Sequence, residues 1–333
     1  MLTAAAARER RFSGIRRVDL RHDLGAIADL IALCFGPRMD AGGRATIREM
    51  RALGRLGPLL GLMAMTDDML RGIGQGFVWV AEGQIVGNVT LFPADFPPEL
   101  GRTTIIANVA VHPDYRRRGI ARRLMAASLE AIRAGGGTAA ILQVEAENTG
   151  ACQLYERLGF RVQRTWHEWR RGTHGPIPPR PLNAPRITLR PPNAWREEYA
   201  LAARLFPAER GGLGWMRPLH PREFRRSLGR HVLDFLSGTG IERWIIREDR
   251  QIAASLWAKS RFGSATTQLT LLVHPARQGT LEAPLLNYAI RRLAVGYRAL
   301  YCEHPADDAA ATAAFERCDF TRRRTLHHMR LDL

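Results

Sequence analysis

The stretch VAVHPDYRRRGIARRLM, residues 109–125, decides the fold of this chain, because it predicts a strand, a tight loop and the start of a helix in immediate succession. The first N–H groups of a helix lack partners within the helix, and the macrodipole favours negative charge beside them. Gly119 lets the backbone turn and approach a ligand closely, since it carries no Cβ. Ala121 keeps the helix start open, and Arg116 to Arg118 add positive charge. The stretch therefore predicts a site for a phosphate-containing ligand.

Around this stretch, hydrophobic periodicity predicts one order of elements twice. In the first half the expected strands are 13–18, 76–83, 84–93, 103–111 and 138–146, and the expected helices are 23–35, 43–65, 121–136 and 149–159. In the second half the expected strands are 186–190, 242–249, 251–260, 266–275 and 299–304, and the expected helices are 194–206, 283–296 and 308–320. LLVHP in the second half aligns with VAVHP, and FERCDF aligns with YERLGF. The chain is therefore expected to be a tandem duplication.

A proline-rich stretch divides the two halves. Residues 173–185, THGPIPPRPLNAP, suit a linker and cannot carry a regular element. We expect residues 1–172 to form the working domain and residues 186–333 to form a second, degenerate copy of it.

The sequence of the loop resembles a known family. Arg116-Arg117-Arg118-Gly119-Ile120-Ala121 matches the R/Q-x-x-G-x-G/A signature of the GNAT superfamily of acyl-CoA N-acyltransferases, and Asn148 followed by LYERLGF (154–160) matches its neighbouring motifs. The latter segment is similar to ribosomal-protein N-terminal acetyltransferases. The resemblance implies an α/β chain of two tandem GNAT-like domains, each a central mixed β-sheet flanked by helices. It also implies acetyl transfer from acetyl-CoA to a primary amine by direct attack, without a metal.

The resemblance implies that a defined set of residues binds the acyl donor. These are Val109, Ala110, Val111, Arg116, Arg117, Arg118, Gly119, Ile120, Ala121, Arg122, Asn148 and Tyr155. Main-chain groups of Val109 and Val111 are expected to pair with the pantetheine arm as an added strand would. The N–H groups from Arg117 to Arg122 are expected to hold the pyrophosphate. Asn148 is expected to contact the cofactor arm, to cap the helix that follows it, or to do both.

Two residues are candidates for the chemistry. Tyr155 matches the tyrosine that protonates the departing thiolate in such enzymes, and its alternative role is a partly buried helix aromatic with its hydroxyl bonded to backbone. Gln143 stands where ribosomal-protein acetyltransferases carry a glutamate base, and an amide cannot accept the proton. Glu145 lies two residues on, on the same strand face, so it is the candidate base. Its alternative role is a solvated carboxylate at a strand end.

The second half departs from the signature. Its loop is two residues shorter, with Ala276 in place of the leading arginine and Leu281 in place of the small residue. Phe315 stands where Tyr155 stands, and Asp319 where Gly159 stands. Each change removes a donor contact or the proton donor, so the second copy is expected to be non-catalytic.

Composition sets the remaining expectations. The net charge is +17, but Lys259 is the only lysine and the arginines are spread along the chain, which disfavours a nucleic-acid partner. The sequence has no uninterrupted run of about 18 apolar residues, so we expect no membrane span. Its first residues lack the apolar core of a signal peptide, and we therefore expect a cytoplasmic protein. The four cysteines have no zinc-type spacing and are expected to be reduced thiols.

Three functions are compatible with these residues. The first is an enzyme that acetylates a small-molecule or peptide amine. The second is a binding module that holds acyl-CoA without turning it over, as the loss of the base at Gln143 would allow. The third is an interaction protein that keeps only the fold, which the intact loop disfavours. The sequence does not determine the amine or the oligomeric state.

Overall fold

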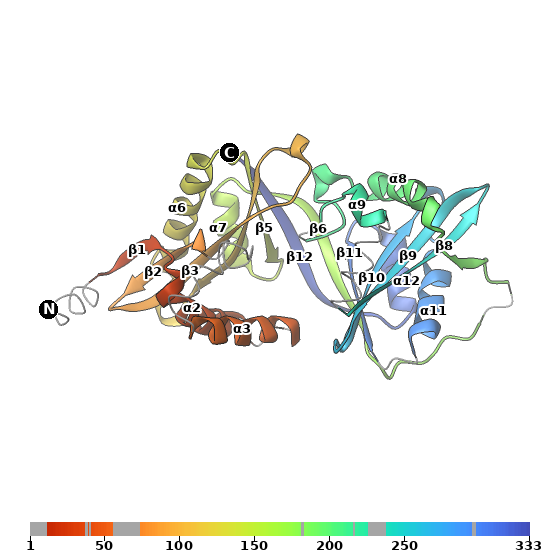
Figure 1. The fold of residues 1–333 in the computed structure, drawn as a ribbon, viewed down its shortest axis with the longest axis horizontal. Helices are drawn as coiled ribbons and strands as arrows, with labels where there is room; N and C mark the ends of the chain where they lie inside the picture. Colours follow the sequence, from red (N-terminus) through yellow and green to blue (C-terminus); the bar gives the residue numbers. More distant parts are fainter. Residues whose placement is uncertain are drawn as a thin grey trace. The chain divides into compact units, whose positions relative to one another are not determined.

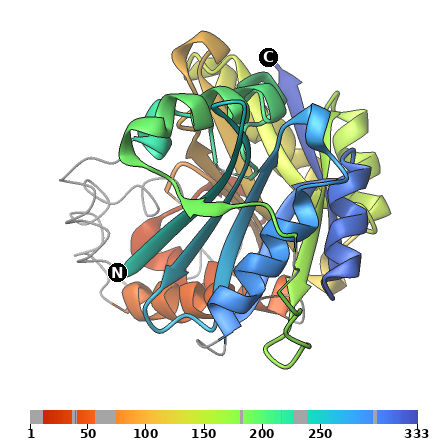
Figure 2. The same ribbon diagram turned by 90° about the vertical axis from the view of Figure 1, so that its right-hand side faces the viewer.

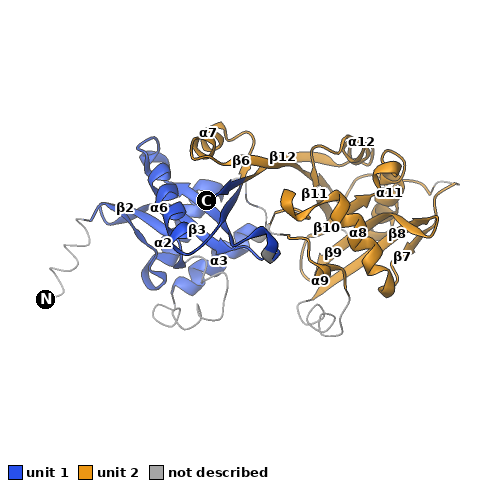
Figure 3. Cartoon of the chain, turned by 90° about the horizontal axis from the view of Figure 1, so that it is seen from above, with its two compact units in different colours: residues 1–142, 330–333 blue, residues 143–329 orange. Residues whose placement is uncertain are grey.

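The computed structural model describes residues 12–36, 39, 41–55, 74–180, 183–215, 217–225, 238–294 and 298–333 (Figure 1). Helices flank a mixed β-sheet, so the α/β class expected from the sequence is confirmed. Contacts divide the chain into two compact units, residues 1–142 with 330–333 and residues 143–329 (Figure 3). These units are defined by contacts between residues, whereas the boundaries expected at residues 172 and 186 separate functional domains. The functional boundaries stay a prediction.

The first unit contains an antiparallel series of strands that ends in one parallel pair. Its strands are β1 (Gly14–Arg17), β2 (Phe77–Ala81), β3 (Gln84–Pro93), β4 (Thr103–Val111) and the first part of β5 (Ala139–Glu145). The predicted hairpin turn lies between β2 and β3, where Glu82 and Gly83 have φ of 52° and 76°. A short 3₁₀ turn, η3 (Pro98–Leu100), precedes β4.

In the described part of the first unit, three helices flank these strands. Figure 1 shows α6 (Ile120–Ala134) on one face, and α2 (Leu20–Phe35) and α3 (Ala41–Gly54) on the other. Asp19 caps α2 by accepting from the N–H of Arg21. Apolar residues of α2 and α3 are buried against Val78 and Val80 of β2. The predicted helix over 43–65 is confirmed as far as Gly54, and residues 56–65 lie outside the described part of the chain.

The second unit repeats this order. Its strands β7 (Ile187–Leu189), β8 (Thr239–Glu248), β9 (Gln251–Arg261) and β10 (Thr266–Val273) are antiparallel in turn, and β11 (Ala299–Pro305) is parallel to β10. Its helices are α7 (Thr149–Arg157), α8 (Trp195–Leu205), α9 (Pro221–Phe224), α11 (Glu282–Leu293) and α12 (Ala309–Arg317). The short 3₁₀ turns η5 (Pro192–Ala194), η6 (Ala208–Arg210) and η7 (Pro275–Arg277) connect them. Figure 2 shows α11 and α12 in blue, and α11 packs on α12 and β9.

The two repeats exchange their last strands. β6 (Arg161–Arg171), the last strand of the first repeat, pairs antiparallel with β11 of the second repeat, from Pro305 opposite Trp166 to Leu300 opposite Arg171. β12 (Thr321–Asp332), the last strand of the chain, lies between β5 and β6. The N–H of Ala146 donates to the carbonyl of Thr325 across this junction. Neither β6 nor β12 is among the elements that we predict from periodicity.

Aromatic packing explains where β6 lies. Trp166 and Trp169 are fully buried. The Trp169 ring stacks on Phe315 of α12 at 5.3 Å, and Trp166 stacks on Phe206 at 5.9 Å. Phe206 and Phe315 both belong to the second repeat, and burying large aromatic side chains is among the strongest contributions to a core. β6 therefore completes the core of the second repeat.

Candidate functional site

The loop between β4 and α6 has the backbone geometry of an anion site. His112 begins a 3₁₀ turn, η4 (Pro113–Tyr115), and its ring nitrogen accepts from the N–H of Asp114. Arg117 and Gly119 have φ of 61° and 76°, in the left-handed region. A Cβ placed on Gly119 would meet no atom within 4 Å. The space in front of Gly119 is therefore open.

The helix start leaves backbone donors open. The N–H of Arg123 donates to the carbonyl of Gly119 at 3.1 Å, which is the first hydrogen bond of α6. In the described part of the chain, the N–H groups from Arg117 to Arg122 have no acceptor outside α6. These donors lie at the positive end of a helix of 15 residues. An oxyanion is the ligand that they fit.

The arginines of the loop keep their charge available. Arg116, Arg117 and Arg118 are exposed. Arg116 donates from Nε to the carbonyl of Val111 at 3.2 Å, and Arg118 donates to the carbonyl of Asp114 at 3.0 Å. Carbonyl oxygens orient these guanidinium groups without neutralising them. The positive potential of the loop is therefore available to a polyanion.

Close packing holds the helix start against the sheet. Ile120 and Leu124 are buried, and a Cβ on Gly87 of β3 would lie 2.9 Å from Ile120 and 3.0 Å from Leu124. Only glycine at position 87 allows α6 to approach β3 this closely. Gly87 is thus a positioning residue for the loop, and the sequence analysis does not identify it.

The end of β4 separates from β5. The two parallel strands pair only from Thr103–Ile105 with Ala139–Ile141. Asn108 has a φ of 51°, a value that asparagine tolerates better than most residues, and the pairing with β3 shifts register beside it. Buried Asn88 donates to the carbonyl of Asn108 at 3.1 Å and holds this bulge.

Beyond the bulge, Ala110 and Val111 pair with β3 only, opposite Asn88 and Gly87. In the described chain, the edge of β4 opposite β3 has no strand partner around Val109 to Val111. An extended ligand can pair with such an edge as an additional strand. The Val111 carbonyl also accepts from the Cys34 thiol at 3.4 Å.

Tyr155, in α7 of the second unit, is buried, and its ring packs edge-on against Phe160 at 6.1 Å. In the described chain its hydroxyl has no hydrogen-bond partner, so the alternative of a hydroxyl bonded to backbone is not what the structure shows. Burial raises the pKa of Tyr155 well above its ordinary value, and the Cys152 thiol nearby adds to the effect. The phenol therefore stays protonated at neutral pH and is available as a donor.

Asn148 caps α7. Its Oδ1 accepts from the N–H of Ala151 at 3.3 Å, so the capping role expected from the sequence is confirmed. The helix ends before Gly159, which has a φ of 94°. Asn148 is exposed, and the capping bond leaves its amide nitrogen available to a ligand.

The two candidate base positions differ in their surroundings within the second unit. The Gln143 amide donates to Nε2 of His328 at 2.9 Å. Burial lowers the pKa of His328 to about 3, so this imidazole is neutral and accepts the bond. Glu145 is partly buried and forms an ion pair with Arg324 of β12 at 3.4 Å. Arg324 also pairs with Glu168, so β12 brings a cation to the carboxylates of two neighbouring strands.

The corresponding loop of the second repeat is closed by its own side chain. Gly279 has a φ of 83°, like Gly119, but its N–H donates to Oε1 of Glu282 at 3.0 Å. Glu282 is buried in the first turn of α11, and counting from the two glycines it takes the place of Arg122. A carboxylate thus occupies the helix start where the first repeat carries an arginine.

Phe315, at the position of Tyr155, is fully buried between Trp169, His304 and Phe320 and offers no proton.

Residues 56–160 match a family model described as Acetyltransferase (GNAT) family. This segment belongs to the GNAT family. The matched range contains β4, the loop, α6 and α7, which are the elements that carry the geometry above. The tandem GNAT-like fold of the whole chain agrees with a solved tandem GNAT protein from the clavulanic acid biosynthesis pathway. That structure is 17% identical with a TM-score of 0.56, over 96% of this chain and 98% of the other.

Curated relatives of the GNAT segment are N-acetyltransferases. The rat protein N-acetyltransferase 8B is 34% identical over 99 residues, which are 29% of this chain and 44% of the relative. The [ribosomal protein bS18]-alanine N-acetyltransferase of Salmonella typhimurium is 35% identical over 68 residues, which are 20% of this chain and 46% of the relative. The chain thus spans under half the length of these relatives.

All four cysteines are free thiols. Within the described ranges, no helix combines the length and apolar character needed to cross a bilayer, and no three His, Cys, Asp or Glu side chains are grouped for a metal.

Proposed function

We propose that this chain is an N-acetyltransferase that moves an acetyl group from acetyl-CoA to a primary amine, with the acyl donor bound by the first repeat. The observation that carries the proposal is the contrast between the two loops. The first has an open, positively charged helix start at Gly119, and the second has its helix start occupied by Glu282. A loop that served only the fold would need neither the open space nor the unpaired N–H groups.

In this proposal the donor contacts follow the geometry of the first unit. The N–H groups from Arg117 to Arg122 bind the pyrophosphate, and Arg116 and Arg118 add charge from their exposed guanidinium groups. The open edge from Val109 to Val111 pairs with the amides of the pantetheine arm. These N–H groups are already oriented in the free protein, so they can bind the pyrophosphate without rearrangement.

The chemistry is a direct attack. The amine nitrogen forms a bond to the thioester carbonyl carbon, the C–S bond breaks, and the departing thiolate takes a proton from Tyr155. The phenol is protonated at neutral pH and therefore carries the proton that this step needs, while burial raises its pKa. We propose that Glu145 accepts the proton lost by the amine, directly or through water. Arg324, which forms an ion pair with Glu145, lies on the neighbouring strand β12 and orients the carboxylate.

We further propose that residues 1–172 act as the catalytic domain, with residues 173–185 as linker and residues 186–333 as a non-catalytic copy. The closed loop at Glu282 and the buried Phe315 support this division of labour. The acceptor is a small-molecule amine or a peptide N-terminus. Gln143 separates this chain from the ribosomal-protein acetyltransferase motif, so the acceptor of the Salmonella relative is not assigned to it.

The test is acetyl-CoA turnover by the full chain against a panel of small amines and peptide N-termini, with free thiol release as readout. The proposal expects amine-dependent thiol release and an acetylated product. Acetyl-CoA binding without thiol release for any amine would instead identify an acyl-CoA-binding module. Absence of binding would exclude both functions.

A further inference from the structure

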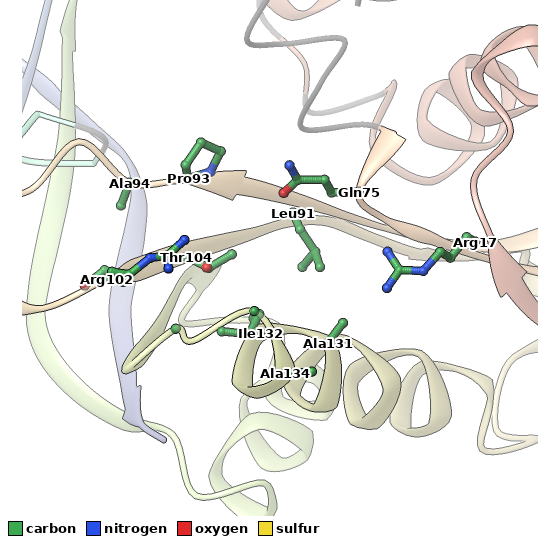
Figure 4. Close-up of a pocket in the computed structure, with 13 residues that line it drawn as sticks. Arg17, Gln75, Leu91, Pro93, Ala94, Arg102, Thr104, Ala131, Ile132 and Ala134 are labelled. Carbon is green, nitrogen blue, oxygen red and sulfur yellow. The ribbon is translucent and has the colours of Figure 1, made fainter. Parts of the chain in front are cut away.

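A cavity of about 620 Å³ lies in the first unit, away from the candidate donor site. Its walls come from β1, β3, β4 and the C-terminal end of α6, and Figure 4 shows the side chains that line it. From Ile120, at the loop, to Ile132, at the cavity, α6 rises by about 18 Å at 1.5 Å per residue. The volume falls within the range of sites for small organic ligands.

The lining carries two arginines and, among its described residues, no aspartate or glutamate. Figure 4 shows Arg17 and Arg102 at opposite ends of the cavity. The Arg17 guanidinium lies 5.3 Å from the centre of the Phe77 ring, a contact that leaves its charge intact. Within the described chain, the Arg102 guanidinium forms neither a hydrogen bond nor an ion pair. Two separated cations without acidic partners fit a ligand with two separated anionic groups.

The surface between the arginines is mostly apolar. Leu91, Ala131 and Ile132 lie there, with the hydroxyl of Thr104 as a polar group among them (Figure 4). The planar fork of a guanidinium matches a carboxylate with two parallel hydrogen bonds. A methylene chain fits the apolar middle better than a compact inorganic anion does, because it removes that surface from water. We propose that this cavity binds a linear aliphatic dicarboxylate, with one carboxylate at Arg17 and the other at Arg102.

The test is calorimetric titration of the full chain with succinate, adipate and suberate, with hexanoate and inorganic phosphate as comparison ligands. At least one dicarboxylate should bind saturably and more tightly than both comparison ligands. Arg17→Gln and Arg102→Gln should each weaken that binding by about 10-fold or more, since each removes a hydrogen bond between charged groups. Arg133→Gln is the matched control, because Arg133 is exposed on α6 and does not line the cavity. It should bind as the wild type does.

A further variant leaves both charges in place. Ala131→Leu adds volume to the apolar middle on a helix that tolerates leucine, and it should abolish dicarboxylate binding while circular dichroism stays unchanged. Absence of saturable binding to the wild type would overturn the proposal. Equal binding by the two arginine variants and the control, or phosphate binding as tight as the best dicarboxylate, would overturn it as well.

Discussion

Replacing Gly119 with alanine should damage donor binding far more than it damages the fold. A Cβ at this position meets no protein atom within 4 Å, so it causes no steric clash in the free protein. The φ of 76° costs a non-glycine residue about 1–2 kcal/mol, and the free energy of unfolding should fall by that amount. The same Cβ points into the space proposed for the pyrophosphate. Loss of one hydrogen bond to a charged group there weakens acetyl-CoA binding by about 10-fold or more.

The second repeat provides the matched control. Gly279 has a φ of 83°, and a Cβ on it would also meet nothing within 4 Å, so Gly279→Ala carries the same strain. Its N–H is already bound to Glu282, and the proposal assigns it no ligand. Calorimetry gives the acetyl-CoA affinity of each variant, and urea unfolding gives its stability with and without ligand. At a concentration of about 100 times the wild-type dissociation constant, acetyl-CoA should stabilise the wild type and Gly279→Ala by about 2.7 kcal/mol. A 10-fold weaker Gly119→Ala variant should gain only about 1.4 kcal/mol. Full stabilisation of Gly119→Ala, or its loss in Gly279→Ala, would refute the reasoning.

Three further substitutions test the remaining roles. Tyr155→Phe should lower turnover by about 10²–10⁴-fold at unchanged acetyl-CoA affinity, as expected for loss of a general acid, and a turnover within a few-fold of wild type would make Tyr155 structural. Glu145→Gln should depress the rate at neutral pH and recover part of it at high pH, where the free amine is abundant, and a flat response in the pH–rate profile would remove Glu145 as the base. His328 is neutral when folded, with a pKa lowered to about 3 from 6.5 by burial, whereas the unfolded chain takes up a proton below pH 6.5. Its contribution to stability is therefore present above pH 6.5 and is lost as the pH falls towards 3, at no more than about 1.4 kcal/mol per pH unit. His328→Gln should flatten urea-unfolding stability across that window, and an unchanged slope would show that other groups cause it.

The local elements could be predicted because their signals are local. The alternation in residues 103–111 gives β4 with the bounds that the structure has, and Glu82-Gly83 gives the turn between β2 and β3. The two halves of the sequence carry similar series of predicted strands and helices. They predict a tandem order of elements, which is confirmed. The bulge at Asn108 is different, because it depends on a side-chain hydrogen bond from Asn88 on another strand.

The exchange of last strands could not be predicted. β6 and β12 are strands of similar length, 11 and 12 residues, and each begins with exposed positions and buries side chains further along. A period of two identifies a strand but not the neighbour with which it pairs. The choice is made by long-range packing, such as Trp169 on Phe315, which no local pattern contains.

The residue that closes the loop of the second repeat, Glu282, is visible in the sequence but is not among the differences that we predict from it. Counting from the two glycines places Ala276 opposite Arg116 and Leu281 opposite Ala121. The same count, one residue further on, places Glu282 opposite Arg122 and shows the reversal of charge. That Glu282 turns back to the N–H of Gly279 is a property of the folded loop.

The most direct test of the central claim is thiol release from acetyl-CoA by the full chain in the presence of an amine panel, measured side by side for Gly119→Glu and Gly279→Glu. The account predicts amine-dependent thiol release by the wild type and by Gly279→Glu, with a loss in Gly119→Glu, whose carboxylate would repel the pyrophosphate. Release abolished by the change at Gly279 and retained with the change at Gly119 would contradict it.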